Sequence, residues 1–479
     1  MRKSHYNLTA LCGLTALAAG VFHYYPFLVL ALLQLALILV FAVGRLWSLR
    51  KSQTYEKTPA DHSGSWTPFF SVHIATYSEP PELVIKTLRS LENLKGADYE
   101  VLVVDNNTPD PALYEPVRAF CDQVGFKFFH FDNVQGAKAG ALNLILSEMD
   151  RRASHVLVLD ADYEAHPDLL VQASRYTSSD CALVQFPQSY RNAADGCPLT
   201  HEYASFFDVY MTAADEADSV LSTGTAAIVR ISDLLEVGGW PTTTITEDAD
   251  LGLILKQHEK DTKYVHRPIA EGVMPTVPED FLKQRSRWIK GNLQVLRKHT
   301  SLQELSLEGR LSAFLQLTAW TSPLLLFPLI VLLGTLKMAL GTPLGEILPV
   351  LLLSYASVGI YQIFLTYFFL MSDTERPFKT RLQASVLHVG TYWTSLRAVF
   401  EGLSGKELNF ERTRKDNTRN PGDDSYLSLL SPAVILVCIG IGCIRYFDPV
   451  VGLGWVLLAF PTFARTYLHY VFSRVHNRT

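Results

Sequence analysis

The stretch His155–Asp162 (HVLVLDAD) is a short apolar run that ends in two aspartates separated by one residue. An unbroken apolar run bounded by polar residues predicts a strand buried on both faces, as in a parallel sheet. Ligands of such sheets bind beyond the carboxyl ends of the strands, so Asp160 and Asp162 are expected at the mouth of a site. Two carboxylates at this spacing suit Mg²⁺ or Mn²⁺. The alternative interpretation is that both aspartates merely cap a strand–loop junction.

Similar runs precede and follow this stretch, and they alternate with helical patterns. Strands are predicted at residues 69–76, 99–104 and 182–185. Helical periodicity covers residues 81–94 and 140–149. This alternation predicts an α/β domain with a mostly parallel sheet and right-handed crossovers, extending over about residues 68–300.

The composition excludes some classes of protein. Hydrophobic residues make up 48% of the 479-residue chain and charged residues 19%, and the apolar excess gathers at both ends. The net charge of -5 indicates no nucleic-acid binding. The cysteines lack any CxxC spacing, which favours free thiols over a disulfide framework or a zinc site; they are Cys12, Cys121, Cys181, Cys197, Cys438 and Cys443.

Two apolar runs near the start, residues 8–22 and 27–43, predict a transmembrane hairpin within residues 1–51. The first run alone also resembles a signal peptide, but the second follows too closely for that to be the simple interpretation. Residues 52–67 are polar and predict a linker. Arg45, Arg50 and Lys51 follow the second run and Arg2 and Lys3 precede the first, so both ends of the hairpin are expected in the cytoplasm.

The C-terminal part, residues 301–479, is again apolar. Spans are predicted within residues 314–340, 347–371, 427–444 and 450–472. Residues 381–403 mix charged and apolar side chains, which favours an amphipathic helix at the membrane surface. Together with the N-terminal hairpin, these runs make about six spans. Because Lys and Arg crowd residues 373–419 and the tail, we expect the α/β domain and both termini in the cytoplasm.

Polar residues follow the other predicted strands. Thr76, Tyr77 and Glu79 end the first strand, and Asp105 ends the second, so all should share a sheet edge with Asp160. Such groups can hydrogen-bond a base and a ribose, although each is equally compatible with a capped turn. Lys138 lies at a predicted helix start, where a lysine and the helix N-terminus can together bind a pyrophosphate. The alternative interpretation is a surface lysine without this role.

Two further motifs carry candidate chemistry. Thr246-Glu247-Asp248 opens a predicted helix, where acidic residues are stabilising in any protein. The functional interpretation makes Asp248 a general base with Glu247 in support. In Gln284-Arg285-Ser286-Arg287-Trp288, an arginine can stabilise phosphate charge and the indole can stack on a sugar. The alternative is an interfacial tryptophan with membrane-edge arginines.

Taken in order, these motifs resemble those of the membrane-integrated, processive family 2 glycosyltransferases, relatives of bacterial cellulose synthase, hyaluronan synthase and chitin synthase. The resemblance covers essentially the whole chain. It implies a GT-A nucleotide-diphospho-sugar transferase domain inserted between transmembrane helices. Ser222-Thr223-Gly224-Thr225 falls where cellulose synthases carry an acceptor motif, and residues 410–415 resemble their gating loop.

The resemblance implies a role for each residue. Thr246, Glu247 and Asp248 are expected to be catalytic, and Asp160 and Asp162 to bind Mg²⁺ or Mn²⁺. The donor nucleotide is expected to contact Thr76, Tyr77, Glu79, Asp105, Lys138, Asp160, Gln284 and Arg287. The acceptor is expected at Thr223, Gly224, Thr225 and Trp288, and the gating loop at Phe410, Thr413 and Lys415.

By the same resemblance, we expect an inverting, metal-dependent transferase that polymerises a β-linked polysaccharide from UDP-glucose or UDP-N-acetylglucosamine. The product would pass through its own helices in the inner (plasma) membrane, with lipid bilayer, growing glycan and accessory export subunits as partners. Ser78, Thr223 and Arg412 depart from the family pattern, which leaves the polymer open. The alternatives are a non-processive transferase acting on a lipid or short glycan, an inactive sugar-binding subunit, and a small-molecule transporter.

Overall fold

The computed structural model describes residues 24–55, 68–177, 181–192, 196–404 and 426–476. The chain divides into two compact units. We call Trp47–Trp320, Arg397–Asn420 and Arg474–Thr479 the sheet unit, and Met1–Leu46, Thr321–Leu396 and Pro421–Ser473 the helical unit. The predicted gating-loop residues Phe410, Thr413 and Lys415 and the first apolar run lie outside the described residues.

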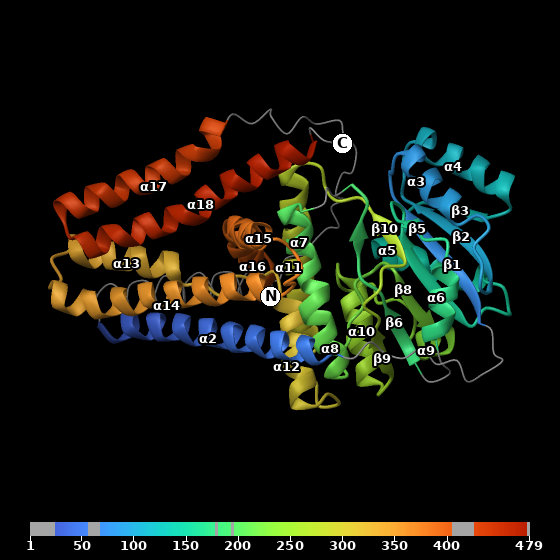
Figure 1. The fold of residues 1–479 in the computed structure, drawn as a ribbon, viewed down its shortest axis with the longest axis horizontal. Helices are drawn as coiled ribbons and strands as arrows, with labels where there is room; N and C mark the ends of the chain where they lie inside the picture. Colours follow the sequence, from blue (N-terminus) through green and yellow to red (C-terminus); the bar gives the residue numbers. More distant parts are fainter. Residues whose placement is uncertain (1–23, 56–67, 178–180, 193–195, 405–425, 477–479) are drawn as a thin grey trace. The chain divides into compact units, whose positions relative to one another are not determined.

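The sheet unit is built on a seven-stranded sheet of order β3-β2-β1-β4-β8-β6-β9 (Figure 1). Neighbouring strands are parallel except that β8 is antiparallel to β4 and β6, which confirms the predicted, mostly parallel sheet. The strands are β1 (Phe69–Thr76), β2 (Asp98–Asn106), β3 (Lys127–Phe131), β4 (His155–Asp160), β6 (Cys181–Gln185), β8 (Ala227–Arg230) and β9 (Asp261–Tyr264).

Alternate side chains of the central strands enter two separate hydrophobic cores. Ile74 of β1 and Leu157 of β4 are fully buried on one face, against Leu88 of α3 (Pro81–Ser90). Val156 of β4 and Leu142 of α5 (Ala137–Leu144) are fully buried on the other face. Helices therefore cover both faces of the sheet, which explains why β4 is apolar at successive positions.

The remaining elements of the sheet unit surround this core. A second, three-stranded sheet has the order β5-β10-β7. Its strands are β5 (Glu164–Ala165), β7 (Ser189–Tyr190) and β10 (Ala270–Gly272). The other helices are α4 (Pro111–Val124), η1 (Leu146–Glu148), α6 (Leu169–Tyr176), α7 (Pro198–Ser205), η2 (Phe206–Met211), α8 (Thr212–Glu216), α9 (Ile231–Glu236), α10 (Glu247–Gln257), α11 (Pro278–Lys298) and α12 (Leu307–Thr318).

Element boundaries differ from the predictions in two places. The helix predicted over residues 140–149 is shorter and starts earlier, as α5 followed by the single turn η1. The compact sheet unit extends to Trp320 and includes α12, whereas the predicted domain ended near residue 300. Buried side chains of α12, such as Ala313 and Leu317, pack with Leu253 of α10, which explains why this helix folds with the sheet unit.

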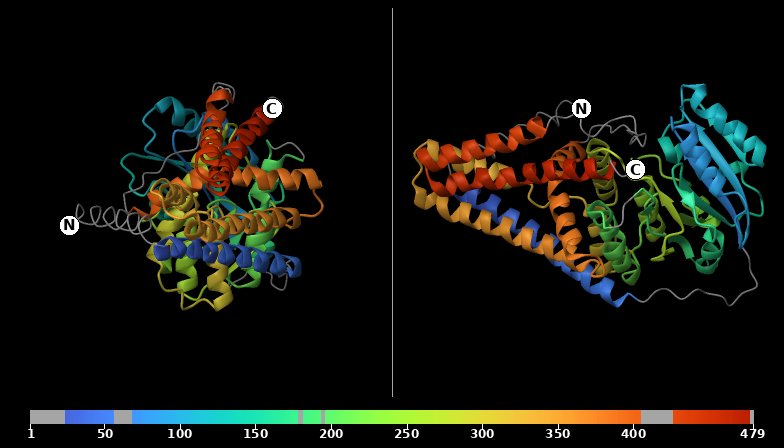
Figure 2. Two further views of the ribbon diagram at one scale, coloured as in Figure 1. Left: turned by 90° about the vertical axis from the view of Figure 1, so that its left-hand side faces the viewer. Right: turned by 45° about the horizontal axis from the view of Figure 1, so that its top comes forward.

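The helical unit contains three helices long and apolar enough to cross a membrane: α2 (Tyr24–Thr54), α14 (Leu344–Met371) and α18 (Pro449–His476). α2 and α14 lie side by side (Figure 2) and are joined by a buried Gln34, whose Nε2 donates to Ser354 Oγ (3.0 Å) and Ser357 Oγ (2.8 Å). Shorter apolar helices are α13 (Phe327–Ala339) and α17 (Tyr426–Tyr446).

The prediction of a single amphipathic helix over residues 381–403 is wrong. The structure has two helices there, α15 (Phe378–Gly390) and α16 (Tyr392–Leu403), separated at Thr391. Ala384 and Leu387 of α15 are fully buried, so packing within the protein, and not surface amphipathicity alone, shapes this segment. Its position at a membrane surface stays a prediction.

Candidate active site

A cleft of about 330 Å³ opens at the carboxyl ends of β1 and β4. It is closed by the loop before β8 and by α5, α10 and α11. Most of the sequence-predicted site residues line it: Thr76, Tyr77, Glu79, Lys138, Asp160, Asp162, Thr223, Gly224, Thr246, Glu247, Asp248, Gln284, Arg287 and Trp288. The tertiary structure therefore gathers motifs that are spread over more than half of the sheet unit's sequence.

Lys138 lies at the first turn of α5 and crosses the cleft. Its Nζ donates to Asp160 Oδ1 (2.5 Å) and to the Gly224 carbonyl (2.7 Å). The Asp160 side chain is 37% exposed, so it remains open to the cleft. Burial works to lower the pKa of Lys138, but Asp160, Glu247 and Asp248 raise it, and the net pKa is raised. Lys138 is therefore a fixed cation, suited to a phosphate group.

Asp162 is held more tightly than Asp160. It is buried, and its Oδ2 accepts a hydrogen bond from the Val273 amide at 3.0 Å. Arg191 Nη1 donates to the Asp162 carbonyl (2.7 Å) and to the Glu271 carbonyl (2.5 Å). The small sheet that carries Glu164 and Glu271 thus fixes the backbone of the Asp160–Asp162 turn.

The two carboxylates fit a divalent cation. Both Asp160 and Asp162 line the cleft, and carboxylate oxygens are the ligands that Mg²⁺ and Mn²⁺ prefer. Among the described residues, no group of three or more His, Cys, Asp or Glu side chains could hold a metal. A cation here would therefore have two protein carboxylates and would take its other ligands from phosphate and water, as Mg²⁺ commonly does.

Asp248 lies in the first turn of α10, beside Glu247. Burial and the neighbouring Glu247 charge raise the pKa of Asp248 to about 7. A carboxylate with a pKa near 7 can act as a general base at neutral pH. Gly224 makes room for it, because a Cβ at that position would lie 2.7 Å from Asp248 Oδ2, and the backbone there has a φ of +85°.

The predicted nucleoside residues fall into two groups. Thr76, Tyr77 and Glu79 line the cleft, whereas Asp105 is buried behind it. Its carboxylate accepts from Thr76 Oγ1 (2.8 Å) and Thr108 Oγ1 (2.8 Å) and contacts His130 Nδ1 (2.9 Å). In this structure Asp105 orients Thr76, and a direct contact of Asp105 with a nucleoside stays a prediction.

A second, smaller cavity of about 70 Å³ adjoins the cleft, and Asp248 lines both. Its walls carry five aromatic side chains: Tyr203, Phe206, Phe207, Trp288 and Trp320. Thr223, Thr246, Asp248 and Trp288 line both cavities. The candidate base therefore stands between a polar cleft with fixed cations and an aromatic cavity suited to the face of a sugar ring.

The loop Ser222–Ala226 is organised by Gln185, which the sequence analysis did not single out. Gln185 is fully buried at the end of β6, and its Nε2 donates to the carbonyls of Phe186, Thr225 and Ala226. Its Oε1 accepts from the Thr223 amide (2.9 Å) and Ser222 Oγ (3.2 Å). Thr225 is also buried and does not line either cavity; its Oγ1 accepts from the Asp160 amide (3.0 Å).

Other cleft residues were missed by sequence reasoning. Asn106 and Asn107 directly follow Asp105 at the end of β2, so the strand-end argument could have found them. Gln188 and Tyr190 come from the segment after β6 and line the cleft as well. Gln188 Nε2 donates to the Thr223 carbonyl at 2.9 Å. No periodicity or motif marks these two positions.

Comparisons with known proteins indicate the family and the fold. The model of glycosyl transferase family 2 matches residues 71–234, and that of glycosyl transferase family group 2 matches residues 155–371. The cellulose synthase catalytic subunit [UDP-forming] of Pseudomonas fluorescens (strain SBW25) is 27% identical over 312 residues, which are 63% of this chain and 41% of that protein.

A probable glucomannan 4-beta-mannosyltransferase 3 of Arabidopsis thaliana is 30% identical over 213 residues, 42% of this chain and 38% of that protein. The chain thus spans less than half the length of these relatives. Among solved structures, the mannosyltransferase PcManGT from Pyrobaculum calidifontis, in complex with GDP-Man and Mn²⁺, has a TM-score of 0.53 and 17% identity. The match covers 75% of this chain and 98% of that chain, and it supports the predicted GT-A fold.

Proposed function

The chain belongs to the family 2 glycosyltransferases of the cellulose synthase type, and we propose that it polymerises a β-linked glycan from a UDP-sugar. The observation that carries the proposal is the position of Asp248 between the polar cleft and the aromatic cavity. A transferase needs a base where a donor site and an acceptor site meet. The donor in this proposal is UDP-glucose or UDP-N-acetylglucosamine.

The donor occupies the polar cleft in this proposal. Thr76, Tyr77 and Glu79 contact the nucleoside, with Asp105 holding Thr76 in place. Lys138 and Arg287 compensate the charge of the diphosphate, and Gln284 lies beside them in the cleft. Support comes from the fixed position of Lys138, whose Nζ already spans Asp160 and the Gly224 carbonyl.

A divalent cation, Mg²⁺ or Mn²⁺, is held by Asp160 and Asp162 in this proposal. PcManGT, whose fold is similar, was solved in complex with GDP-Man and Mn²⁺, which is consistent with the use of a divalent metal by this fold. When bound, such a cation neutralises the negative charge that develops on the leaving diphosphate. Arg191 and the Val273 amide keep Asp162 in position for it.

The acceptor occupies the aromatic cavity, with its terminal sugar against Trp288. Its hydroxyl oxygen attacks the anomeric carbon of the donor while the bond from that carbon to the diphosphate breaks. Asp248 takes the hydroxyl proton, and because the hydroxyl attacks from the face opposite the leaving diphosphate, the new glycosidic bond forms with inversion. Thr223 lines both cavities and Gly224 lines the cleft beside it, and Glu247 keeps the pKa of Asp248 high.

The chain is a multi-pass membrane protein in this proposal, with the sheet unit in the cytoplasm. The three long apolar helices α2, α14 and α18 support it, together with the distribution of Lys and Arg. A growing hydrophilic glycan cannot cross hydrocarbon unaided, so the helices of an inner-membrane synthase have to supply a path. Phe410, Thr413 and Lys415 act as its gating loop, and accessory export subunits are expected partners.

The proposal is tested with the purified full chain in lipid nanodiscs. UDP-glucose, UDP-N-acetylglucosamine and GDP-mannose are supplied with Mn²⁺, and product length is measured by gel filtration and linkage analysis. We expect a β-linked polymer from one UDP-sugar. Addition of a single sugar would instead indicate the non-processive alternative, and no transfer from any donor would overturn the proposal. Equal rates in chelator-treated and metal-replete protein would show that the proposed reaction does not need a divalent cation.

A further inference from the structure

The motif Gln284-Arg285-Ser286-Arg287-Trp288 contains two arginines, and the structure separates their environments. Arg287 lines the donor cleft. Arg285, on the opposite face of α11, lines neither cavity and is only 1% exposed. Its guanidinium forms a buried ion pair with Glu202 of α7, which is fully buried. Arg285 therefore has a partner inside the protein and no access to a phosphate.

Four aromatic rings surround the Arg285 guanidinium. Its Cζ atom lies 3.6 Å from the ring centroid of Trp320, 4.3 Å from that of Tyr203 and 4.7 Å from that of Trp288. The Phe281 ring follows at 4.8 Å. The Trp288 and Trp320 rings are themselves 5.5 Å apart, with 38° between their planes. The guanidinium thus connects the two indoles to each other and to Glu202.

We propose that Arg285 is a positioning residue that fixes the indole of Trp288 for the acceptor sugar. This inference rests on the proposed function and deepens it, because it assigns Arg287 of the motif to the donor site and Arg285 to the acceptor site. Trp288 and Trp320 both line the aromatic cavity next to Asp248. A sugar stacks only on an indole whose plane is fixed, so a rotated Trp288 would move the acceptor hydroxyl away from the base.

The hydrogen bonding of Arg285 supports this role. Within the described part of the chain, its Nε and Nη1 have no hydrogen-bond partner. Those two nitrogens are buried among the rings, so the cation is held by Glu202 on one side and by aromatic faces on the others. Attraction between a cation and a ring depends on the ring's distance and orientation, and it is strongest where water is excluded. A lysine keeps the charge but not the flat guanidinium that stacks on indoles.

The direct experiment observes the tryptophans themselves. The full chain is labelled with 5-fluorotryptophan, and the ¹⁹F resonances of Trp288 and Trp320 are assigned with Trp→Phe variants. In Arg285→Lys we expect both resonances to shift and broaden, while the other five tryptophans keep their positions. The matched control is Asp233→Asn. Like Glu202, Asp233 is a buried carboxylate in an ion pair, here with Arg230 and Lys260, and it lines neither cavity.

Kinetics then separate the acceptor from the donor. We expect Arg285→Lys to raise the acceptor KM about tenfold, the loss of roughly one cation–π contact, and to leave UDP affinity, measured by calorimetry with Mn²⁺, within twofold of wild type. Asp233→Asn should change neither constant. Should Arg285→Lys not fold, Glu202→Gln removes the other half of the ion pair with little change in shape and should shift the same two resonances.

Two outcomes would overturn the inference. One is a Trp288 resonance that stays in place in both variants. The other is a loss of UDP affinity in Arg285→Lys, which would make Arg285 a donor residue. If the wild-type chain transfers no sugar at all, the proposed function fails, but the ¹⁹F spectra still decide whether Arg285 holds Trp288.

Discussion

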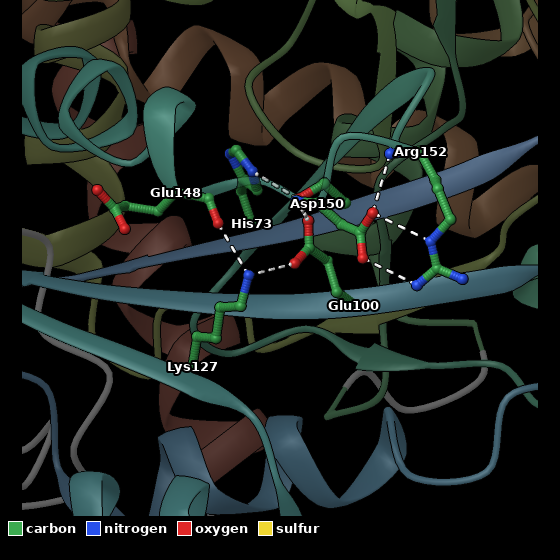
Figure 3. Close-up of polar contacts among 7 residues, drawn as sticks. His73, Glu100, Lys127, Glu148, Asp150 and Arg152 are labelled. Atoms are coloured by element: carbon green, nitrogen blue, oxygen red, sulfur yellow. Dashed lines mark hydrogen bonds and ion pairs between the residues drawn. The ribbon is translucent and has the colours of Figure 1, made fainter.

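The two ends of the central strands are built on opposite electrostatic principles. At the amino-terminal half of β1 and β2, one carboxylate gathers donors from several elements into a polar network (Figure 3), in which Nδ1 of the buried His73 has no hydrogen-bond partner among the described residues. At the carboxyl ends of β1 and β4, charged side chains of both signs from several elements line one cleft. The same strands carry both, so the contrast shows which polar groups stabilise the fold and which are left for a ligand.

The amino-terminal network is centred on Glu100. Its Oε1 accepts from Ser71 Oγ (3.0 Å) and from the Asp150 amide (2.6 Å), and its Oε2 accepts from Lys127 Nζ (2.8 Å). Ser71 Oγ also contacts Nε2 of the buried His73 at 3.0 Å. Glu100 therefore ties together β1, β2, β3 and the loop before β4, as expected for a group that serves stability.

The cleft end is organised differently. The pKa of Asp248 is raised by burial and by Glu247, because the negative charge of Glu247 disfavours a second negative charge next to it. The buried hydroxyls of Thr223 and Thr246 have no hydrogen-bond partner among the described residues. Ala137 and Ala226, next to the cleft, adopt positive φ angles of 50°. Such strain and unmet hydrogen bonding persist where a ligand is expected to complete them.

The largest effect that tests the contrast is expected at Asp248. Asp248→Asn should lower turnover by about 10³–10⁴-fold, because the amide cannot accept the acceptor proton. UDP affinity, measured by calorimetry, should stay close to wild type.

Because the raised pKa of Asp248 opposes folding above the unfolded-state pKa, Asp248→Asn should also unfold at a higher temperature than wild type at pH 8. Unchanged turnover would remove Asp248 as the base.

The next effect is expected from Lys138→Met, which removes the cation that spans the cleft. Turnover should fall about 10²-fold, as for the loss of one charge-stabilising donor. In wild type, kcat/KM should rise as pH increases through about 7, where Asp248 deprotonates. Lys138 lowers the pKa of Asp248, so in Lys138→Met the rise should move to higher pH. A pH–rate profile that does not move would contradict this coupling.

The amino-terminal network should respond in stability and not in turnover. Glu100→Ala leaves the hydroxyl of the buried Ser71 and the partly buried Asp150 amide without an acceptor and should cost about 1–3 kcal/mol in the free energy of unfolding. Glycosyl transfer per folded molecule should equal wild type. The matched control is Glu115→Gln, in an exposed ion pair with Arg118, where the expected change is below about 0.5 kcal/mol. Both are measured by denaturant titration.

The smallest effect is expected from His73. Burial lowers the pKa of His73 to about 3, so the folded protein keeps it neutral while the unfolded chain binds a proton below the ordinary pKa of 6.5. Stability from this residue is therefore present above pH 6.5 and lost as pH falls toward 3. His73→Gln should make the drop in unfolding temperature between pH 7 and pH 5 smaller. An identical drop in wild type and variant would show that His73 is not responsible.

Local patterns were enough to predict a large part of the fold. The apolar run of β4 predicted a strand with buried faces, and it ends in Asp160 at the cleft. The acidic start of α10 placed Asp248 in a first helical turn. Helix starts and strand ends are encoded by neighbouring residues, so they are readable without knowing the tertiary structure. The short strands β3, β8 and β9, of five, four and four residues, carry too little pattern for this and were missed.

From the sequence alone, four of the seven strands (β1, β2, β4 and β6) and the positions of Asp160 at a strand end and Asp248 at a helix start could be predicted, because these depend on residues close together in the chain. Only the tertiary structure decided that Asp105 lies behind the cleft, that Gln185 organises the loop before β8, and that Arg285 turns away from the donor while Arg287 faces it. Arg285 and Glu202 are 83 residues apart. Contacts over such separations depend on how helices and strands pack, and no local pattern records them.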